Sequence, residues 1–404
     1  MSGGALDDIR VVELGDLVSA PYCSKLFSDF GADVVKVERP GTGDRARHWG
    51  PFPGDEPHLE RSGLFAYLNT NKRGVTLDVD RPEGRDVLLR LLEGADVLIE
   101  NNDPRLMRER GLTYDALAAV NPDLVMISIT PFGQTGPYSE WRGYDLNAFH
   151  LTGASHRYCG LPGHAPLEQG TFAAEFFGAT TAATWGLAAT IGRENVGGGQ
   201  QVDVSCAEAV AAPFVGGQNI GGYAQDGVYD RRTGIGMGQA APAAILPCKD
   251  GHVWMIVLEK GQWHGLREAM GEPEWAQLEI FDDMFERARN DDLIYAMVGE
   301  WAMQHTKMEL MERCQALGAP VTAVLTVGEA AELPHLAERH YIVTVDDPDL
   351  GTIRDLAAPF KLPDSPGGPT GPAPRLGQHN AEVYGTELGL APDEIDGLAA
   401  GGVI

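Results

Sequence analysis

The sequence predicts an α/β protein in which a large domain with a parallel sheet is joined to a smaller α+β domain. Within the first 145 residues, short β-branched and apolar runs alternate with segments that carry helix signals, the order of elements that builds a parallel sheet. Each apolar run also ends abruptly in polar, charged or glycine residues. Because ligands bind outside the carboxyl ends of strands in open parallel sheets, this pattern predicts a binding site at one sheet edge.

The first βαβ unit carries a signal at each step. A strand is followed by Ser19 and Pro21, which suit the N-cap and the first turn of a helix that ends near residue 30. Gly31 can end this helix, and a second strand follows at once. The strands predicted in this region cover residues 9–12, 34–37, 96–99 and 124–129.

The rest of the chain predicts a second domain and a returning tail. Residues 178–191 form an Ala- and Thr-rich helix, whereas residues 216–238 are glycine-rich with little periodicity, which is typical of a linker. We therefore assign residues 1–220 and 331–404 to the large domain and residues 221–330 to the linker and the small domain. The other predicted elements are strands at 201–204, 253–257 and 321–324, helices at 207–214 and 380–390, and a hairpin at 341–353.

The composition excludes several classes of protein. A formal net charge of −27 argues against nucleic acid and anionic membranes as partners, because both bind concentrated Lys and Arg. No run approaches the roughly 18 apolar residues of a membrane span, and residues 1–8 lack the features of a signal peptide, so a cytoplasmic protein is predicted. The five cysteines are scattered singly, which predicts reduced packing residues.

The absence of several catalytic motifs excludes further activities. The chain has no GxxxxGK[ST] phosphate loop, no GxSxG elbow and no HExxH pair, so nucleotide hydrolysis, serine hydrolysis and a zinc protease site are not indicated. Its positive charges nevertheless gather in the first 110 residues, close to the predicted strand ends, which favours an anionic small molecule as ligand. These residues are Arg39, Arg45, Arg47, Lys72, Arg73, Arg81, Arg105, Arg108 and Arg110.

One acidic residue, Glu175, has unusual neighbours. It lies between alanines and phenylalanines, immediately before the predicted helix at 178–191. Burial without a partner would raise the pKa of this carboxyl, as is typical of carboxylates used in covalent or proton-transfer chemistry. A surface glutamate favoured by the dipole at a helix start explains the same pattern, so the residue pattern leaves both interpretations open.

Several short motifs follow one another in a fixed order along nearly the whole chain. They include GADVVKVERP at residues 31–40, NKR at 71–73, FGQTGP at 132–137, GYD at 143–145 and LGQH at 376–379. In this order they resemble the motifs of the class III CoA-transferases, the family of formyl-CoA, carnitine and bile-acid CoA-transferases.

The resemblance implies a Rossmann-like large domain, a smaller α+β domain joined by two linkers, and an interlocked homodimer. It also implies that coenzyme A enters as an acyl-CoA donor along the strand ends, that a carboxylic acid is the acceptor, and that no metal takes part. The site residues implied are Arg39 beside the adenine, Leu77 and Asn101 in the CoA groove, Thr130 near the pantetheine, Arg81 and Arg108 at the phosphates, and Gly236 and Gly238 in a glycine loop whose N–H groups stabilise oxyanions.

A covalent mechanism is implied as well, in which a carboxylate attacks the acyl-CoA thioester and the enzyme then carries CoA as a thioester. The catalytic aspartate of the family falls on Glu175, so the carboxylate stands on a side chain one methylene longer. Phe176, Phe177 and Trp185 follow it, and they predict a sizeable or apolar acid as substrate rather than oxalate.

Three other functions remain open. An acyl-CoA racemase of the same superfamily uses a histidine immediately before the aspartate of the GYD position, where this chain has Tyr144. Tyrosine, with a pKa of about 10, is a poor base near neutral pH. The change from aspartate to glutamate also fits a CoA-binding protein without catalysis, or a thioesterase in which water resolves the anhydride.

Overall fold

The chain divides into two compact units. The computed structural model describes residues 4–167, 169–215, 218–229, 231–232 and 240–404. The larger unit comprises Met1–Arg157, Leu167–Tyr229 and Ala337–Ile404, and the smaller unit comprises Tyr158–Pro166 and Asp230–Leu336. Each unit has an apolar core of its own.

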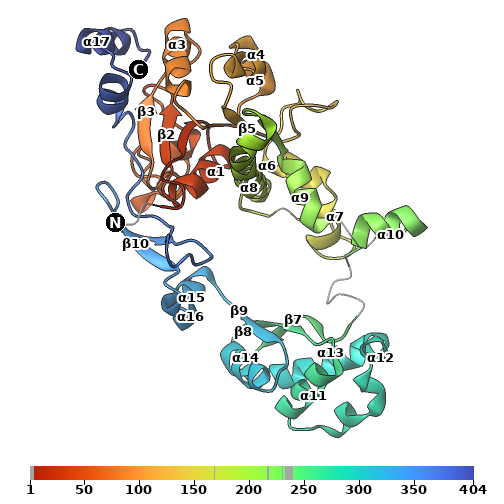
Figure 1. The fold of residues 1–404 in the computed structure, drawn as a ribbon. Coiled ribbons are helices and arrows are strands. Elements are labelled where there is room, and N and C mark those ends of the chain that lie inside the picture. Colours follow the sequence, from red (N-terminus) through yellow and green to blue (C-terminus); the bar gives the residue numbers. More distant parts are fainter. Residues whose placement is uncertain (1–3, 168, 216–217, 230, 233–239) are drawn as a thin grey trace. The chain divides into compact units, whose positions relative to one another are not determined.

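The larger unit is built on a six-stranded sheet in which every strand pair is parallel (Figure 1). The strands are β1 (Arg10–Leu14), β2 (Asp33–Glu38), β3 (Arg73–Thr76), β4 (Val97–Glu100), β5 (Val125–Thr130) and β6 (Gln201–Ser205). Their order is β3-β2-β1-β4-β5-β6, so the direction of strand addition reverses between β1 and β4. The predicted parallel α/β fold is confirmed, and the reversal is the point at which sheets of this topology bind ligands.

Five of these strands lie where the sequence predicts them, and β3 is the strand that it misses. The four residues of β3 read RGVT, which is too short and too polar to stand out as an apolar run. By contrast, all six residues of β5 are buried, as expected of a strand covered on both faces.

The helix α8 (Ala173–Val196) packs on α1 (Ser19–Ser28) and on β5. Small residues permit this close approach, since a Cβ atom on Gly186 would lie 2.1 Å from Cδ1 of Ile127. The helix starts five residues before the predicted residue 178. Glu175 is therefore inside its first turn rather than ahead of the helix, which corrects the expectation from the sequence.

Buried charges join β1 and β2 to the loop that carries Asp44 and to Lys72, the residue before β3. Nζ of Lys36 lies 2.6 Å from Oε1 of Glu13 and 2.6 Å from Oδ2 of Asp44, and Nζ of Lys72 lies 2.9 Å from Oε2 of Glu13. Burial alone would raise the pKa of Glu13, but the two ammonium groups outweigh it and the pKa falls to about 2. Glu13 is thus held as a carboxylate in the interior of the unit.

The smaller unit is an α+β structure, as the sequence predicts. Its antiparallel sheet contains β7 (Ala243–Cys248), β8 (Gly251–Ile256) and β9 (Val321–Val324). Trp263 is fully buried in its core. The guanidinium of Arg287, also fully buried, donates hydrogen bonds to the carbonyl groups of Ala241 and Phe281, both at 2.7 Å, and of Val257 at 2.9 Å.

The tail returns to the larger unit. It forms the hairpin β10 (Ile342–Asp347) and β11 (Gly351–Leu356), and the N–H group of His379 then donates to the carbonyl oxygen of Gly74 in β3 at 2.9 Å. The helix expected at 380–390 is a π-helix, η5 (Ala381–Glu387). Neither α17 (Pro392–Ala400) nor α10 (Gln218–Asp226) is predicted from the sequence, and α10 lies inside the segment interpreted as a linker.

The remaining helices complete the two units. The α-helices are α2 (Gly63–Leu68), α3 (Pro82–Leu92), α4 (Pro104–Glu109), α5 (Tyr114–Ala118), α6 (Asp145–Leu151), α7 (Ala154–Tyr158), α9 (Cys206–Phe214), α11 (Lys260–Ala269), α12 (Met284–Arg289), α13 (Asp291–Ala302), α14 (Lys307–Ala316), α15 (Val327–Ala331) and α16 (Pro334–Glu338). Short 3₁₀ turns cover Arg45–His48, Pro53–Asp55, Glu274–Gln277 and Glu279–Asp282. All five cysteines are buried and free, as predicted.

Candidate active site

Three cavities lie at the carboxyl ends of the parallel strands, and they share lining residues. Arg45 lines the first and the second, Asn102 lines the first and the third, and Asn101 and Thr130 line the second and the third. The three cavities therefore adjoin one another around the switch point between β1 and β4.

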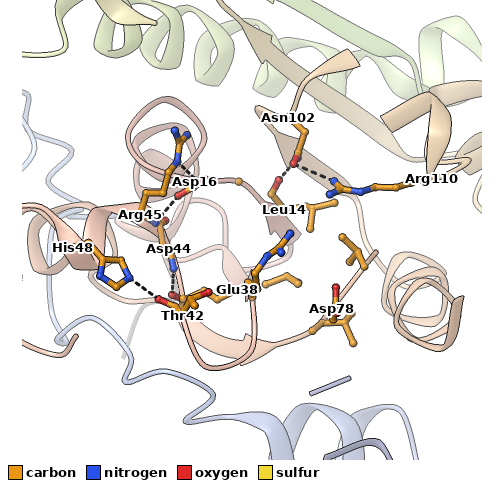
Figure 2. Close-up of a pocket in the computed structure, with 16 residues that line it drawn as sticks. Leu14, Asp16, Glu38, Thr42, Asp44, Arg45, His48, Asp78, Asn102 and Arg110 are labelled. Atoms are coloured by element: carbon orange, nitrogen blue, oxygen red, sulfur yellow. Dashed lines mark hydrogen bonds and ion pairs between the residues drawn. The ribbon is translucent and has the colours of Figure 1, made fainter. Parts of the chain in front are cut away.

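The first cavity has a volume of about 390 Å³ and lies over the ends of β1, β2 and β3 (Figure 2). Leu14, Val37 and Leu77 form an apolar part of its lining, while Arg39 and Arg110 contribute positive charge. This combination suits a ligand with an aromatic or apolar group and anionic groups. The full lining is Leu14, Gly15, Asp16, Val37, Glu38, Arg39, Thr42, Gly43, Asp44, Arg45, His48, Leu77, Asp78, Val79, Asn102 and Arg110.

Two of these arginines share one carboxylate. Nη2 of Arg39 lies 2.7 Å from Oδ2 of Asp80, and Nη2 of Arg110 lies 2.6 Å from Oδ1 of the same residue. Although partial burial works to raise the pKa of Asp80, the two guanidinium groups hold it below its usual range. The pairing fixes both cations at the same side of the cavity.

The second cavity, of about 110 Å³, contains Glu175. The backbone N–H group of Ser19, at the start of α1, donates a hydrogen bond to Oε2 of this carboxyl at 3.0 Å. The cavity is lined by Leu17, Ser19, Arg45, Asn101, Ile129, Thr130, Pro131, Gly143, Tyr144, Asp145, Ala148, Glu175 and Cys206. Glu175 is thus a partly buried side chain aimed into a small polar chamber, and the surface-glutamate interpretation is wrong.

Burial and neighbouring charges tune Glu175 to neutral pH. Burial raises its pKa most, the N–H group of Ser19 lowers it, the carboxylate of Asp145 raises it, and the guanidinium of Arg45 lowers it. The resulting pKa is about 7. A carboxyl with this pKa is ionised in a large fraction of molecules near neutral pH and is more basic than an ordinary glutamate, which suits a nucleophile or a general base.

Asp145 supplies the N-terminal cap of α8 from another element. The residue before this helix, Phe172, has a left-handed φ of 34° and its side chain gives no cap. Instead, Oδ1 of Asp145 accepts the N–H group of Glu175 at 3.0 Å. Burial raises the pKa of Asp145, and hydrogen bonds from the N–H groups of the first turn of α8 only partly offset this effect.

The loop between β1 and α1 is held on two sides. Oδ1 of Asn101 accepts the N–H group of Asp16 at 2.9 Å, and its Nδ2 donates to the carbonyl oxygen of Asp16 at 2.7 Å and to Oγ of Ser19 at 2.9 Å. Leu17 has a φ of 65°, a conformation that costs about 1–3 kcal/mol, and its N–H group donates to Oδ1 of Asp44 at 2.9 Å. These contacts fix the segment from which Ser19 reaches the second cavity.

The third cavity, of about 160 Å³, extends the site along the loop after β5. Oγ1 of Thr130 accepts the N–H group of Gly133 at 2.9 Å, which orders the start of this loop. The stacked rings of Tyr138 and Trp141, with centroids 4.0 Å apart, lie in the same loop region, and Trp141 lines the cavity. An elongated ligand therefore has room on both sides of the Glu175 chamber.

The residues predicted as ligand contacts fall into three groups. Arg39 and Leu77 line the first cavity, and Asn101 and Thr130 line the second and third. Arg81 and Arg108 lie outside these three linings. Nε of Arg81 lies 3.8 Å from Oε2 of Glu83, and Arg108 forms an ion pair with Glu140. Gly236 and Gly238 lie outside the described residues.

Three residues that line the cavities, Arg110, Arg45 and Asp145, are not among the individual site residues predicted from the sequence. The basic cluster and the GYD motif contain them, but loop geometry decides which members of such a cluster face inward. The aromatic residues expected beside Glu175 do not line its cavity: the ring of Phe176 packs against Tyr22, that of Phe177 against Phe214, and Trp185 is 62% exposed.

The described part of the chain shows neither a cluster of metal ligands nor a helix that could span a membrane. Within it, no three His, Cys, Asp or Glu side chains are grouped so that they could hold a metal ion. None of the helices described there is both long and apolar enough to cross a membrane.

Known proteins resemble this chain over nearly its whole length. The profile described as CoA-transferase family III matches residues 6–380. The succinyl-CoA–D-citramalate CoA-transferase of Chloroflexus aurantiacus is 34% identical over 99% of this chain and 98% of its own, and the formyl-CoA:oxalate CoA-transferase of Streptomyces avermitilis is 33% identical over 99% of each. Among solved structures, a CAIB/BAIF family protein from Brucella suis has a TM-score of 0.83 and 30% identity, covering 95% of this chain and 99% of its own. The chain belongs to CoA-transferase family III, and its relatives support a CoA-transferase activity.

Proposed function

We propose that this protein transfers CoA from an acyl-CoA thioester to a carboxylic acid, with Glu175 as the covalent nucleophile. The observation that carries the proposal is the setting of Glu175 in a small polar chamber, with Oε2 bonded to the N–H group of Ser19 and with a pKa of about 7. The chamber adjoins a larger cavity with arginines on its lining, in which the CoA moiety would lie.

The reaction runs through two kinds of enzyme adduct. A carboxylate oxygen of Glu175 attacks the thioester carbonyl carbon of the donor, the C–S bond breaks, and a mixed anhydride and a CoA thiolate form. The thiolate attacks the glutamyl carbonyl of the anhydride, which releases the donor acid and leaves Glu175 as a CoA thioester. The acceptor carboxylate then attacks this thioester, and the released thiolate attacks the acceptor carbonyl, so that acyl-CoA leaves and the carboxylate returns.

The chain supplies groups for each species on this route. The N–H group of Ser19 reaches the carboxyl of Glu175, where it would stabilise negative charge on that oxygen as the carbonyl is attacked. In this proposal Arg39, Leu77 and Arg110 contact the adenine and phosphate end of CoA, and Asn101 and Thr130 contact the pantetheine. Arg81 and Arg108 would have to leave their present ion pairs to contact phosphate. Gly236 and Gly238 remain proposed oxyanion donors.

The names of the relatives narrow the substrate class. They act on succinyl-CoA with D-citramalate or L-malate, and on formyl-CoA with oxalate. The polar lining of the Glu175 chamber agrees better with small polar acids than with the apolar acid expected from Phe176, Phe177 and Trp185. We therefore propose small carboxylic acids as donors and acceptors.

Two features of the whole protein belong to the same proposal. We propose an interlocked homodimer and a cytoplasmic location, in keeping with the family resemblance. The long helix α8 supports the dimer, because it exposes Trp185, Ile191 and Val196 to between 62% and 72%, a large apolar surface for a single chain. The large unit would then bind CoA in each protomer.

Intact-protein mass spectrometry with a panel of acyl-CoA donors tests the mechanism. We expect an added mass of CoA on the wild-type protein, located on Glu175 by digestion and absent from Glu175→Gln. Glu208→Gln, a change at another helix-start glutamate, serves as the matched control and should keep the adduct. CoA release without an acceptor would indicate a thioesterase, and binding of every donor without an adduct would refute the covalent mechanism.

A further inference from the structure

The side chain of Arg45 stands between the two cavities that adjoin Glu175. It lines the first cavity of about 390 Å³ and also the Glu175 chamber of about 110 Å³. Its side chain is 58% exposed, so a ligand in either cavity has access to the guanidinium. Among the described residues that line the Glu175 chamber, no other is a Lys or an Arg.

The guanidinium of Arg45 is held by one ion pair and keeps hydrogen-bond donors available for a ligand. Its Nε pairs with Oδ2 of Asp16, and its backbone N–H group donates to Oδ1 of the same carboxylate at 2.7 Å (Figure 2). Asp16 is itself fixed through its backbone by Asn101. Within the described residues, the two terminal nitrogens of Arg45 donate no hydrogen bond, so a fork suited to a planar carboxylate remains available.

The acidic residues of the chamber create a need for a positive charge when a second carboxylate binds there. The carboxyl groups of Glu175 and Asp145 both line the chamber, and they would repel a substrate that brings a second carboxylate. Arg45 carries the charge that offsets this repulsion. A monocarboxylic acyl group has no such requirement, because its only carboxyl is the one that becomes the thioester.

We infer that Arg45 determines specificity by binding the non-reacting carboxylate of a dicarboxylic acyl group, so that dicarboxylic acids are the preferred substrates. The inference rests on the proposed function, since it assumes that the acyl group is brought to Glu175 as a CoA thioester. It goes beyond that function by naming the residue that binds the terminal carboxylate of the acyl group.

Two other roles for Arg45 predict a different pattern. As a counter-charge of Glu175 alone, Arg45 would lower the pKa of that carboxyl and would assist every donor equally. As a ligand of a CoA phosphate, it would also act on every donor equally, because the CoA moiety is constant. Only a contact with the far carboxylate separates donors that differ at that end.

The test uses pairs of donors of equal length, one with a terminal carboxylate and one with a terminal methyl group: malonyl- and propionyl-CoA, succinyl- and butyryl-CoA, glutaryl- and pentanoyl-CoA. Single-turnover formation of the CoA adduct on Glu175 is followed by mass spectrometry at pH ~9, where a carboxyl with a pKa of about 7 is ionised in all variants. The measured quantity is the rate ratio within each pair.

Arg45→Met should lower the rate ratio of the preferred pair by about 10- to 100-fold, the usual effect of losing a charged hydrogen bond. Arg45→Lys should lower it less, since a point charge remains without the fork. The matched control is Arg39→Met, because Arg39 is 60% exposed, pairs with Asp80 at 2.7 Å and lines the first cavity only. It should slow both members of a pair alike and leave the ratio unchanged.

The outcomes separate the inference from the function on which it rests. If the adduct forms on Glu175 and Arg45→Met leaves the ratio as in the wild type, the dicarboxylate role is overturned while the transferase mechanism stands. The dicarboxylate role is overturned as well if Arg39→Met lowers the ratio as much as Arg45→Met. If no donor gives an adduct in the wild type, the proposed function fails and the inference falls with it.

Discussion

The raised pKa of Glu175 depends on residues that are distant in the sequence. Ser19 lies 156 positions before it and Asp145 lies 30 positions before it, and both form hydrogen bonds with it. Burial together with Asp145 raises the pKa of Glu175, while Ser19 and Arg45 limit the rise, so the carboxyl titrates with a pKa of about 7. A free glutamate would be fully ionised at that pH and a weaker nucleophile.

The raised pKa of Glu175 predicts the pH dependence of adduct formation. In the proposed mechanism the carboxylate attacks the donor, so the single-turnover rate should rise about tenfold per pH unit below a pKa of about 7 and level off above it. Stability should change in the opposite direction. Because the folded state holds this proton more tightly than the unfolded state, the wild type loses stability relative to Glu175→Gln as pH rises from about 4.5 to about 7.

Thermal unfolding of both proteins across this pH range measures that second effect. Above neutral pH the melting temperature of Glu175→Gln should exceed that of the wild type. This difference in melting temperature should become smaller as the pH is lowered. A difference that stays constant with pH would mean that Glu175 has an ordinary pKa.

Shortening the side chain tests how closely the chamber fits a glutamate. Glu175→Asp withdraws the carboxylate by roughly one ångström, a displacement that can cost about a hundredfold in rate. We expect adduct formation to slow by about that factor, with unchanged thermal stability and unchanged CoA binding. Equal rates of adduct formation for the wild type and Glu175→Asp would show that the loop with Ser19 moves to keep its contact with the shorter carboxylate.

At the scale of elements, the start of α8 depends on α6. Asp145, the first residue of α6, accepts hydrogen bonds from the N–H groups at the start of α8, which has no cap of its own. One carboxylate therefore fixes both the register of the helix and the position of Glu175. The proposed nucleophile is carried by a helix that another helix holds in place.

Two substitutions of Asp145 separate its capping role from its charge. Asp145→Ala removes the cap and should lower the free energy of unfolding by about 1 kcal/mol. Asp145→Asn keeps an oxygen acceptor and should cost less, but it removes a negative charge beside Glu175. The pH profile of adduct formation should therefore move to lower pH in Asp145→Asn, and an unmoved profile would show that the carboxylate has no electrostatic effect on Glu175.

The buried ion pairs of Lys36 connect β1, β2 and the loop that carries Asp44. Lys36→Met leaves Glu13 with one ammonium partner and removes the ammonium contact of Asp44, so we expect a loss of about 3–5 kcal/mol in chemical denaturation. Arg39→Met removes an exposed pair and should cost no more than about 1 kcal/mol. Similar losses for both variants would contradict the structural importance of the buried network.

At the scale of the whole molecule, the candidate site belongs to one of the two units. The described residues that line the three cavities around Glu175 are all part of the larger unit. The smaller unit has its own core around the fully buried Trp263. CoA binding in the first cavity should therefore tolerate damage to the other core.

Trp263→Ala tests this separation. The loss of a fully buried indole should destabilise the smaller unit by about 3–5 kcal/mol, which calorimetry would detect as a lower first transition. The dissociation constant of CoA, measured at a temperature below that transition, should stay at the wild-type value. Loss of CoA binding in this variant would mean that the smaller unit completes the CoA site.

The sequence by itself determined the class of the sheet and five of its six strands, because β-branched runs with helix signals between them leave few alternatives to a parallel α/β fold. Through the family resemblance it also led us to propose Glu175, Arg39, Leu77, Asn101 and Thr130 as site residues, and each of them lines at least one of the three cavities. It missed β3, α10 and α17, because β3 has only four residues and the two helices are short and contain glycine, so each carries little local pattern.

Only the tertiary structure decided which side chains surround Glu175. Among the described residues, Arg45 is the one member of the basic cluster that lines the Glu175 chamber, Asp145 lines it together with the rest of the GYD motif, and Phe176 turns toward Tyr22 instead of into the chamber. The physical reason is that local pattern sets which element a residue belongs to, whereas the packing of α1, α6 and α8 against one another sets the direction in which each side chain points. The pKa of the proposed nucleophile, and with it the chemistry, follows from that direction.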